Sequence, residues 1–317
     1  MSDNINTTNG KASMMYVGET PWHGLGTKLD KPATASEAII AAGLDYTVEK
    51  FDLTTFQSNL PVENHFATVR TDTKQVLGVV GSRYTPIQNK DAFTMFDALV
   101  GEGEAIYHTA GALGKGERIW LLAKLPDYIR INDNDIVEKF LLLTNTHDGS
   151  STVRVKLTPI RVVCQNTLSI ALSGTEQEVS VRHTVQAIER LKKAHEILGL
   201  SNWLYTELNH IFQGMGKKEL SKPHFKYYVE SIFPDINMKC PPHRKQIREK
   251  IYELAETGVG AELAKGTLWG AYNAVTEFVD HCRLDNRNDS TRLKSMWFGT
   301  GEIIKKRAFT LARGMLN

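Results

Sequence analysis

The feature that most constrains the fold is a change of hydrophobic period near Gly174. From Tyr46 to Leu157, apolar and polar residues alternate in short runs, as they do in half-buried β-strands. Beyond Gly174 the apolar residues recur three and four positions apart, as they do in amphipathic helices. We therefore predict an α+β protein: a mostly antiparallel sheet built from hairpins with packed helices, followed by a helical region.

Turn signals divide the strand region into hairpins. Asp148 and Gly149 lie between two apolar runs and supply the positive φ that a tight hairpin turn needs. Gly114 and Gly116 give a second signal of the same kind. The predicted strand pairs are 65–70 with 75–80, 105–112 with 118–125, and 137–145 with 152–158.

Capping residues and helical spacing predict the helices. Thr34 and Glu37 form a capping-box pattern, and Gly43 is a stop signal for the helix that follows them. Pro242 opens another helix and Gly258 closes it. The predicted helices are 34–42, 89–100, 164–172, 184–198, 221–233, 242–257, 268–282 and 302–315.

These patterns suggest four segments. They are an N-terminal arm with a Trp-His-Gly loop (1–32), an α+β sheet domain (33–173), a linker (174–183) and a helical domain (184–317). The polar residues 1–13 are expected to be disordered. No run approaches the roughly 18 apolar residues of a membrane-spanning helix, and the N-terminus has no secretory apolar core. With only three cysteines, the expected location is a reducing cytoplasm, without membrane association.

Charge is uneven along the chain. Residues 181–317 hold 22 Lys or Arg against 15 Asp or Glu, whereas residues 1–180 hold 16 against 21. The basic clusters at 192–193, 217–218, 243–245 and 305–307 are typical of solvated helix faces. The same excess also suits a polyanionic partner for this half of the chain. The sequence leaves both interpretations open.

Basic residues alternate with apolar ones on two predicted strands. Arg118, Trp120 and Lys124 share one face of the first strand. On the second, Arg154 and Lys156 lie opposite Val153 and Val155, and no acidic residue occurs between Asp148 and Glu176. If these faces meet, cations would neutralise phosphates and Trp120 would stack a base. The alternative is a solvated sheet face with basic side chains. The predicted nucleic-acid-binding residues are Arg118, Trp120, Lys124, Asn145, His147, Arg154, Lys156 and Arg161.

Other features are weaker. His147 beside Asp148 has the residue types of a general base, but Asp148 is also explained by the turn. The segment Trp22–Gly26 is either a ligand loop or a packing anchor for Trp22. The common catalytic and phosphate-loop motifs are absent, and the cysteines lack convincing metal-ligand spacing. We therefore predict no catalytic residue, no metal and no cofactor.

Several separated strings together resemble a known family. They are residues 11–26, 79–88, 143–151, 158–167, 266–273 and 297–301. They are similar to the phage/plasmid-like protein family, whose central part is a domain of unknown function, number 932. The resemblance implies a home on phages, prophages or plasmids, but no mechanism. In outline the architecture also resembles Rad52-like and RecT-like phage annealing proteins, which form rings or filaments and hold single-stranded DNA without nucleotide hydrolysis.

The first hypothesis is a non-enzymatic protein that binds single-stranded DNA during replication or recombination and forms a homo-oligomer. One alternative is an enzyme or host-interference factor with a site around Trp22–Gly26 and His147–Asp148. Another is a structural protein that self-assembles through exposed apolar stripes.

Overall fold

A computed structural model describes residues 5–18, 25–31, 33–100, 106–161, 166–167, 178–187, 189, 201–237, 239–283, 295–297 and 299–316. It contains both helices and a largely antiparallel sheet, so the predicted α+β class is confirmed. No helix in these residues is long and apolar enough to span a bilayer.

The chain divides into two compact units, each assembled from three stretches of sequence. Unit 1 comprises residues 1–126, 140–157 and 178–199, and unit 2 comprises residues 127–139, 158–177 and 200–317. Two long strands belong to both units. β9 (Arg118–Asn132) begins in unit 1 and ends in unit 2, and β10 (Asp135–Thr146) begins in unit 2 and ends in unit 1.

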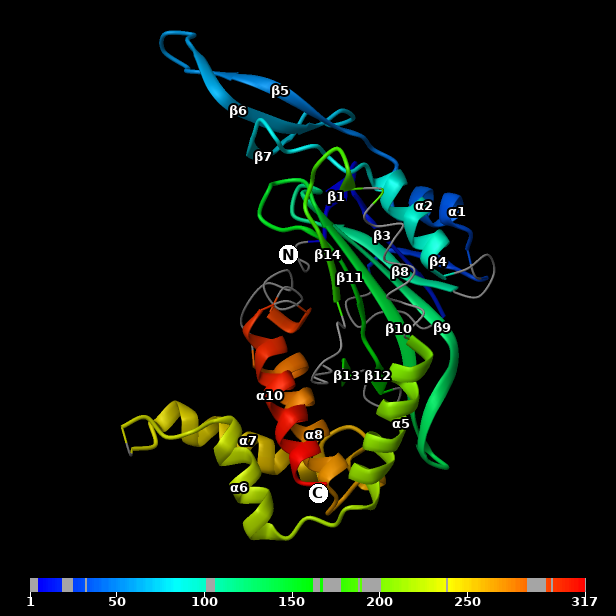
Figure 1. The fold of residues 1–317 in the computed structure, drawn as a ribbon, viewed down its shortest axis with the longest axis vertical. Helices are drawn as coiled ribbons and strands as arrows, with labels where there is room; N and C mark the ends of the chain where they lie inside the picture. Colours follow the sequence, from blue (N-terminus) through cyan, green and yellow to red (C-terminus); the bar gives the residue numbers. More distant parts are fainter. Residues whose placement is uncertain are drawn as a thin grey trace. The chain divides into compact units, whose positions relative to one another are not determined.

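Unit 1 contains the antiparallel hairpins (Figure 1). β8 (Ile106–Leu113) pairs with β9 and with β3 (Met14–Val17), which pairs in parallel with β4 (Thr27–Leu29). β11 (Val153–Leu157) lies between β10 and β14 (Glu178–Val181). The helices of the unit include α1 (Ala35–Ala41) and α2 (Asn89–Val100).

The predicted local signals act as expected. Thr34 and Glu37 complete a capping box on α1, and Gly43 takes a positive φ of 63° after its end. Gly114, Gly116 and Gly149 have positive φ values in the two hairpin turns. Glycine adopts such turn conformations without a steric penalty. The strand registers confirm the three predicted pairs, including 65–70 with 75–80, whose turn has Lys74 rather than a glycine at positive φ.

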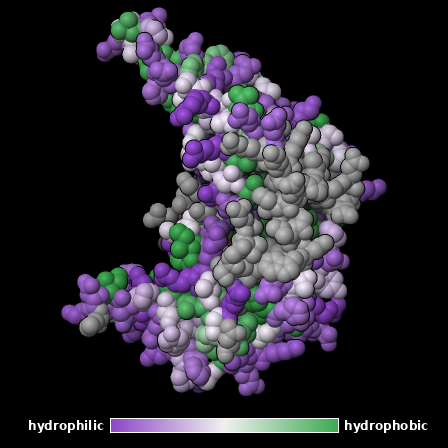
Figure 2. Space-filling model, viewed as in Figure 1, coloured by the Kyte–Doolittle hydropathy of each residue, from purple (hydrophilic) through white to green (hydrophobic). Residues whose placement is uncertain are grey.

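A second sheet in unit 1, which we call the arm, consists of β5 (Val48–Thr54), β6 (Pro61–Arg70) and β7 (Val76–Gly81). Its inner face packs on the hairpin turns: Thr68 donates to the His147 carbonyl, and Gly78 closely approaches Asp148. Its outer end projects beyond the rest of the unit (Figure 1). Apolar side chains are exposed along the arm, namely Phe51, Phe56, Leu60, Val62, Val76 and Val79. Figure 2 shows hydrophobic patches on its projecting end.

Unit 2 is helical around a central helix, α8 (Leu268–Glu277), whose residues are all buried. Trp269 contacts Phe212, and its indole donates to Asp135 Oδ2 over 2.9 Å. The surrounding elements are α5 (Ser201–Lys217), α6 (Lys222–Ile232), α7 (Pro242–Thr257), the short turns η1 (Ala261–Leu263) and η2 (Phe278–Cys282), and α10 (Thr300–Gly314). Two short strands, β12 (Ile160–Arg161) and β13 (Asn166–Thr167), also belong to it.

Several of the helices predicted in the C-terminal half are present with the expected ends. The Ser221 side chain accepts from the His224 backbone at the start of α6, and α7 has the predicted bounds. The helix predicted at 268–282 is present as α8 continued by the π-helical turn η2. Lys305 is not on a solvated face: it is buried with Asp280, 2.8 Å from its carboxylate.

Several expectations are corrected. Disorder at residues 5–13 is wrong, because β1 (Thr7–Thr8) pairs with β2 (Lys11–Ala12) and Asn6 is buried against β8. Part of the helix predicted at 164–172 is instead the strand β13. The expected linker contains β14, and α5 was not predicted. Most of the helix predicted at 184–198 lies outside the described residues.

Candidate functional site

Only part of the predicted basic face on β9 is accessible. Trp120 is 3% exposed, and its ring packs over Gly111 on β8, where a side chain would collide with it. The expectation that this ring is open for stacking is therefore wrong. Arg118 is half-buried and donates to Ser150 Oγ over 3.2 Å, and Lys124 is half-buried near the middle of the strand.

The basic residues of β11 face a neighbouring strand. Because β14 pairs with β11, it brings Glu178 opposite Lys156, and Arg154 Nε lies 3.1 Å from the Glu178 carboxylate. Lys156 is 9% exposed. An open row of free cations is therefore not present on β11. Arg161 lies on β12, paired with Val137, and its side chain is outside the described residues.

Asn145 and His147 form the centre of a sealed polar cluster in unit 1. Both are fully buried on the same side of β10. The Asn145 amide donates to the Ile87 carbonyl over 2.9 Å, and His147 Nε2 lies 2.8 Å from Asn89 Oδ1. Neither residue is at an exposed hairpin tip, because the arm and the start of α2 cover the end of β10. The expectation that they contact a ligand there is not met in this conformation.

Nearby groups complete this cluster. His183 stacks on Tyr84 with ring centroids 4.7 Å apart, and Tyr84 donates to the Thr146 carbonyl. Burial lowers the pKa of His147 to about 3 and that of His183 to about 4, while Asp148 acts in the opposite direction on both. A neutral, inaccessible His147 has the properties of a structural group rather than of a general base. Trp22 and His23, the other half of the enzymatic hypothesis, lie outside the described residues.

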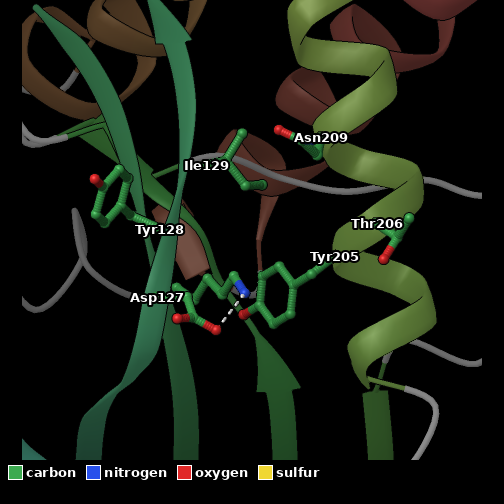
Figure 3. Close-up of a pocket in the computed structure, with 7 residues that line it drawn as sticks. Asp127, Tyr128, Ile129, Tyr205, Thr206 and Asn209 are labelled. Atoms are coloured by element: carbon green, nitrogen blue, oxygen red, sulfur yellow. Dashed lines mark ion pairs between the residues drawn. The ribbon is translucent and has the colours of Figure 1, made fainter. Parts of the chain in front are cut away.

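Unit 2 carries an open groove of about 570 Å³ between α5 and the outer parts of β9 and β10 (Figure 3). The residues that line it are Asp127, Tyr128, Ile129, Lys139, Tyr205, Thr206 and Asn209. Its size is within the range of small-molecule sites. In Figure 3 the ring of Tyr205 reaches from α5 toward Asp127.

The groove holds one cation between an aromatic ring and a carboxylate. Lys139 Nζ lies 4.7 Å from the centre of the Tyr205 ring and 3.8 Å from Asp127 Oδ2. The Asp127 side chain is 83% exposed, so its attraction for Lys139 is screened by water. Burial raises the pKa of the Tyr205 phenol far above its ordinary value, so this group remains a hydrogen-bond donor.

The rim of the groove combines an aromatic residue with an arginine. Tyr128 is 48% exposed, and Arg130 Nη2 donates to its hydroxyl over 2.8 Å. Gln213 of α5 donates to the Arg130 carbonyl, which fixes β9 against the helix. Lys217 follows Gln213 by one helical turn, so both lie on the side of α5 nearest this part of β9.

At the end of α5 the chain forms a basic corner, which we define as Lys217, Lys218, Lys222, Lys226 and Tyr227. All five are exposed, and Tyr227 is 62% exposed. Among the described residues, no ion-pair partner is found for Lys217, Lys218 or Lys222, and Lys226 reaches Glu230 only at 4.0 Å. No acidic residue lies in the first turn of α6, where the helix dipole would favour one.

Sequence reasoning missed the groove but noted part of the corner. The pair Lys217-Lys218 was recognised as a possible polyanion guide, whereas Tyr128 and Arg130 were not singled out. Their alternation with Ile129 and Ile131 is the strand signal that identifies them. Lys139 and Tyr205 come together only through the packing of α5, which no local pattern reveals.

In the part of the chain that the structure describes, no group of three or more His, Cys, Asp and Glu side chains could hold a metal ion. A family model described as "Domain of unknown function (DUF932)" matches residues 76–297, well over half of the chain. No curated protein matches the sequence, and no solved structure does so either.

Proposed function

Because the chain belongs to the DUF932 family, whose description assigns no activity, we propose from its surface chemistry that it binds single-stranded DNA without catalysing a reaction. The observation that carries this proposal is the basic corner of unit 2. There, Lys217, Lys218 and Lys222 are exposed and have no carboxylate partner among the described residues, and Tyr227 on the same helix as Lys222 is exposed as well.

Part of the charge excess of the C-terminal half lies in this corner. Residues 217–227 contain four Lys against one Glu. The positive end of the α6 dipole adds to the same potential. Such a surface attracts a phosphate backbone, and each lysine that contacts a phosphate releases condensed counterions.

Tyr227 gives the reason to favour single strands. Its ring is exposed on α6, the helix that also carries Lys222 and Lys226 one turn apart. An exposed ring on a basic surface stacks an unpaired base, which a duplex does not offer. In unit 1, Arg118 and Lys124 are half-buried and remain secondary candidates for backbone contacts.

The proposed setting is a phage or plasmid replicon in a bacterial cytoplasm, where transient single strands arise during replication and recombination. This part of the proposal rests on the resemblance of the separated sequence strings described above.

The test compares two triple variants with equal loss of charge. Lys217→Ala/Lys218→Ala/Lys222→Ala removes the basic corner, and Lys28→Ala/Lys74→Ala/Lys90→Ala removes three exposed lysines from unit 1. Oligonucleotide binding is measured by fluorescence anisotropy at several salt concentrations. We expect the first variant to lose at least tenfold in affinity and about 2 in the slope of log K against log salt. Equal effects of the two variants, or no effect of the first, contradict the proposal.

Self-assembly is a second candidate function, which the arm favours. Its outer sheet face aligns Phe51 and Val79 on either side of Ala67, and Phe56 is fully exposed at the hairpin end. Exposed apolar surface of this kind favours self-association. Light scattering with and without oligonucleotide tests it. We expect Phe51→Ser/Val79→Ser to reduce the mass of the particle, and an unchanged monomeric mass of the native chain rejects the idea.

A further inference from the structure

The groove of unit 2 contains a buried polar group with no partner. The Tyr205 hydroxyl is buried and makes no hydrogen bond with any described residue. A buried hydroxyl without a partner costs about 1–3 kcal/mol, so such groups in native proteins call for an explanation. Since Tyr205 lines the groove, an acceptor atom of a ligand there would satisfy it.

The cation beside this hydroxyl is only loosely held. Lys139 lies over the Tyr205 ring, and its 3.8 Å separation from Asp127 is longer than a hydrogen bond. The Lys139 side chain is 14% exposed, and the carboxylate that it pairs with among the described residues is 3.8 Å away. An anionic oxygen between Lys139 and Tyr205 would supply both missing interactions.

The remaining walls suit the rest of a nucleotide. Asn209 contributes an amide, and Thr206 a hydroxyl, on the α5 side of the groove. Tyr128 stands at the rim with almost half of its surface exposed, and Arg130 holds its hydroxyl. Figure 3 shows Tyr128 and Ile129 on opposite sides of β9, with Ile129 facing α5. Ile129 therefore offers an apolar surface inside the groove, and the Asn209 amide offers hydrogen bonds, for a nucleobase.

We propose that this groove binds one nucleotide, with a phosphate oxygen between Lys139 and Tyr205 and the base against Ile129 and Asn209. This site is separate in chain position from the basic corner and does not depend on it. The phosphate could belong to a free mononucleotide or to the end of a strand, and both present the same chemistry. The group that opposes binding is Asp127, whose negative charge faces the same cation.

The test uses thymidine 5′-monophosphate and thymidine as probes in titration calorimetry with the full chain. We expect the monophosphate to bind at least tenfold more tightly than thymidine, because the phosphate carries the contact with Lys139. A 5′-phosphorylated and an unphosphorylated oligonucleotide distinguish a strand end from a free nucleotide. Equal, weak binding of the monophosphate and the nucleoside overturns the proposal.

Two substitutions give effects of opposite sign. Tyr205→Phe removes only the unpartnered hydroxyl, so it should weaken monophosphate binding about fivefold while leaving the melting temperature unchanged or higher. Asp127→Asn removes the competing charge, so it should tighten binding severalfold. The control is Tyr107→Phe in unit 1, whose hydroxyl donates to the Phe93 carbonyl far along the chain from the groove.

These variants also separate this inference from the function proposed above. If the basic-corner variant loses oligonucleotide binding while Tyr205→Phe and Asp127→Asn bind the monophosphate like the native chain, the groove is not a nucleotide site and strand binding stands. If Tyr205→Phe and Asp127→Asn change monophosphate binding as expected, but the basic-corner variant binds oligonucleotide like the native chain, the nucleotide site stands and the proposed strand binding is rejected.

Discussion

The polar cluster around His147 in unit 1 and the groove around Lys139 in unit 2 are built from similar side chains but differ in access. Both contain buried polar atoms without partners among the described residues: Nδ1 of His147 and Oδ1 of Asn145 in the first, and the Tyr205 hydroxyl in the second. The arm and the start of α2 close the first. The second opens into a cavity.

The difference shows that residue type alone does not identify a binding site. His147, Asn145 and Trp120 have suitable chemistry for nucleic acid, yet each is at most 3% exposed. Tyr128 and Lys217 have ordinary sequence contexts and are accessible. We therefore expect substitutions in the cluster to change stability and substitutions on unit 2 to change binding.

Acidification should lower the stability of unit 1, where the two buried histidines lie, and this is the largest effect expected. The pKa values of His147 and His183 are about 3 and about 4 in the folded chain, below the ordinary 6.5. The unfolded chain therefore binds more protons between these values, and stability falls as the pH drops from about 6.5 toward 4. Each histidine contributes at most about 1.4 kcal/mol per pH unit.

Urea unfolding at pH 7.5, 6.5, 5.5 and 4.5 measures this dependence. His183→Phe replaces a stacked ring, whose nitrogens have no partner among the described residues, by an apolar ring, so the variant should show a shallower loss of stability on acidification. Parallel curves for the native chain and the variant would show that His183 is not buried in its neutral form.

Arg70→Met should give the next largest effect. Arg70 is 1% exposed, pairs with Asp72, donates to Asn6 and to the Lys115 carbonyl, and lies over the Tyr46 ring. Its loss leaves these acceptors unsatisfied, and we expect a decrease of about 3 kcal/mol in the free energy of unfolding.

Arg83→Met is the matched control, because Arg83 is exposed in the same unit. The two variants should bind oligonucleotide equally well while still folded. Arg70 reaches the sealed cluster through Tyr46, whose ring lies edge-on to His147. Weaker binding by folded Arg70→Met would mean that these buried groups take part in recognition, which would remove the distinction between the two regions.

Tyr227→Ala should give the smallest of the expected effects, a modest loss of affinity for single strands. Because Tyr227 is 62% exposed, its removal should leave the melting temperature unchanged. Loss of one stacking ring should weaken single-strand binding by about 1 kcal/mol, or about fivefold. Phe56→Ala deletes an exposed aromatic from the arm and should leave affinity unchanged. The same affinity for both variants would contradict stacking on α6.

The sequence predicted the parts of the fold that local chemistry determines. The capping box at Thr34, the glycine turns at Gly114 and Gly149, and the bounds of α7 follow from interactions within a few residues. The predicted site depended on which strands are neighbours. β14 was not anticipated, so the pairing of Arg154 with Glu178 was not visible, and neither was the packing of Trp120 over Gly111.

The interleaved connectivity of the two units has a practical consequence for dissecting the protein. The chain leaves and re-enters each unit, so no single cut separates them into contiguous pieces. The stretch matched by the family model, residues 76–297, omits Arg70 of one unit and Lys305 of the other, each of which is a buried cation paired with a carboxylate. A protein made of residues 76–297 alone would contain Asp280 without its ammonium partner Lys305. The family boundaries therefore mark shared ancestry rather than an autonomous folding module.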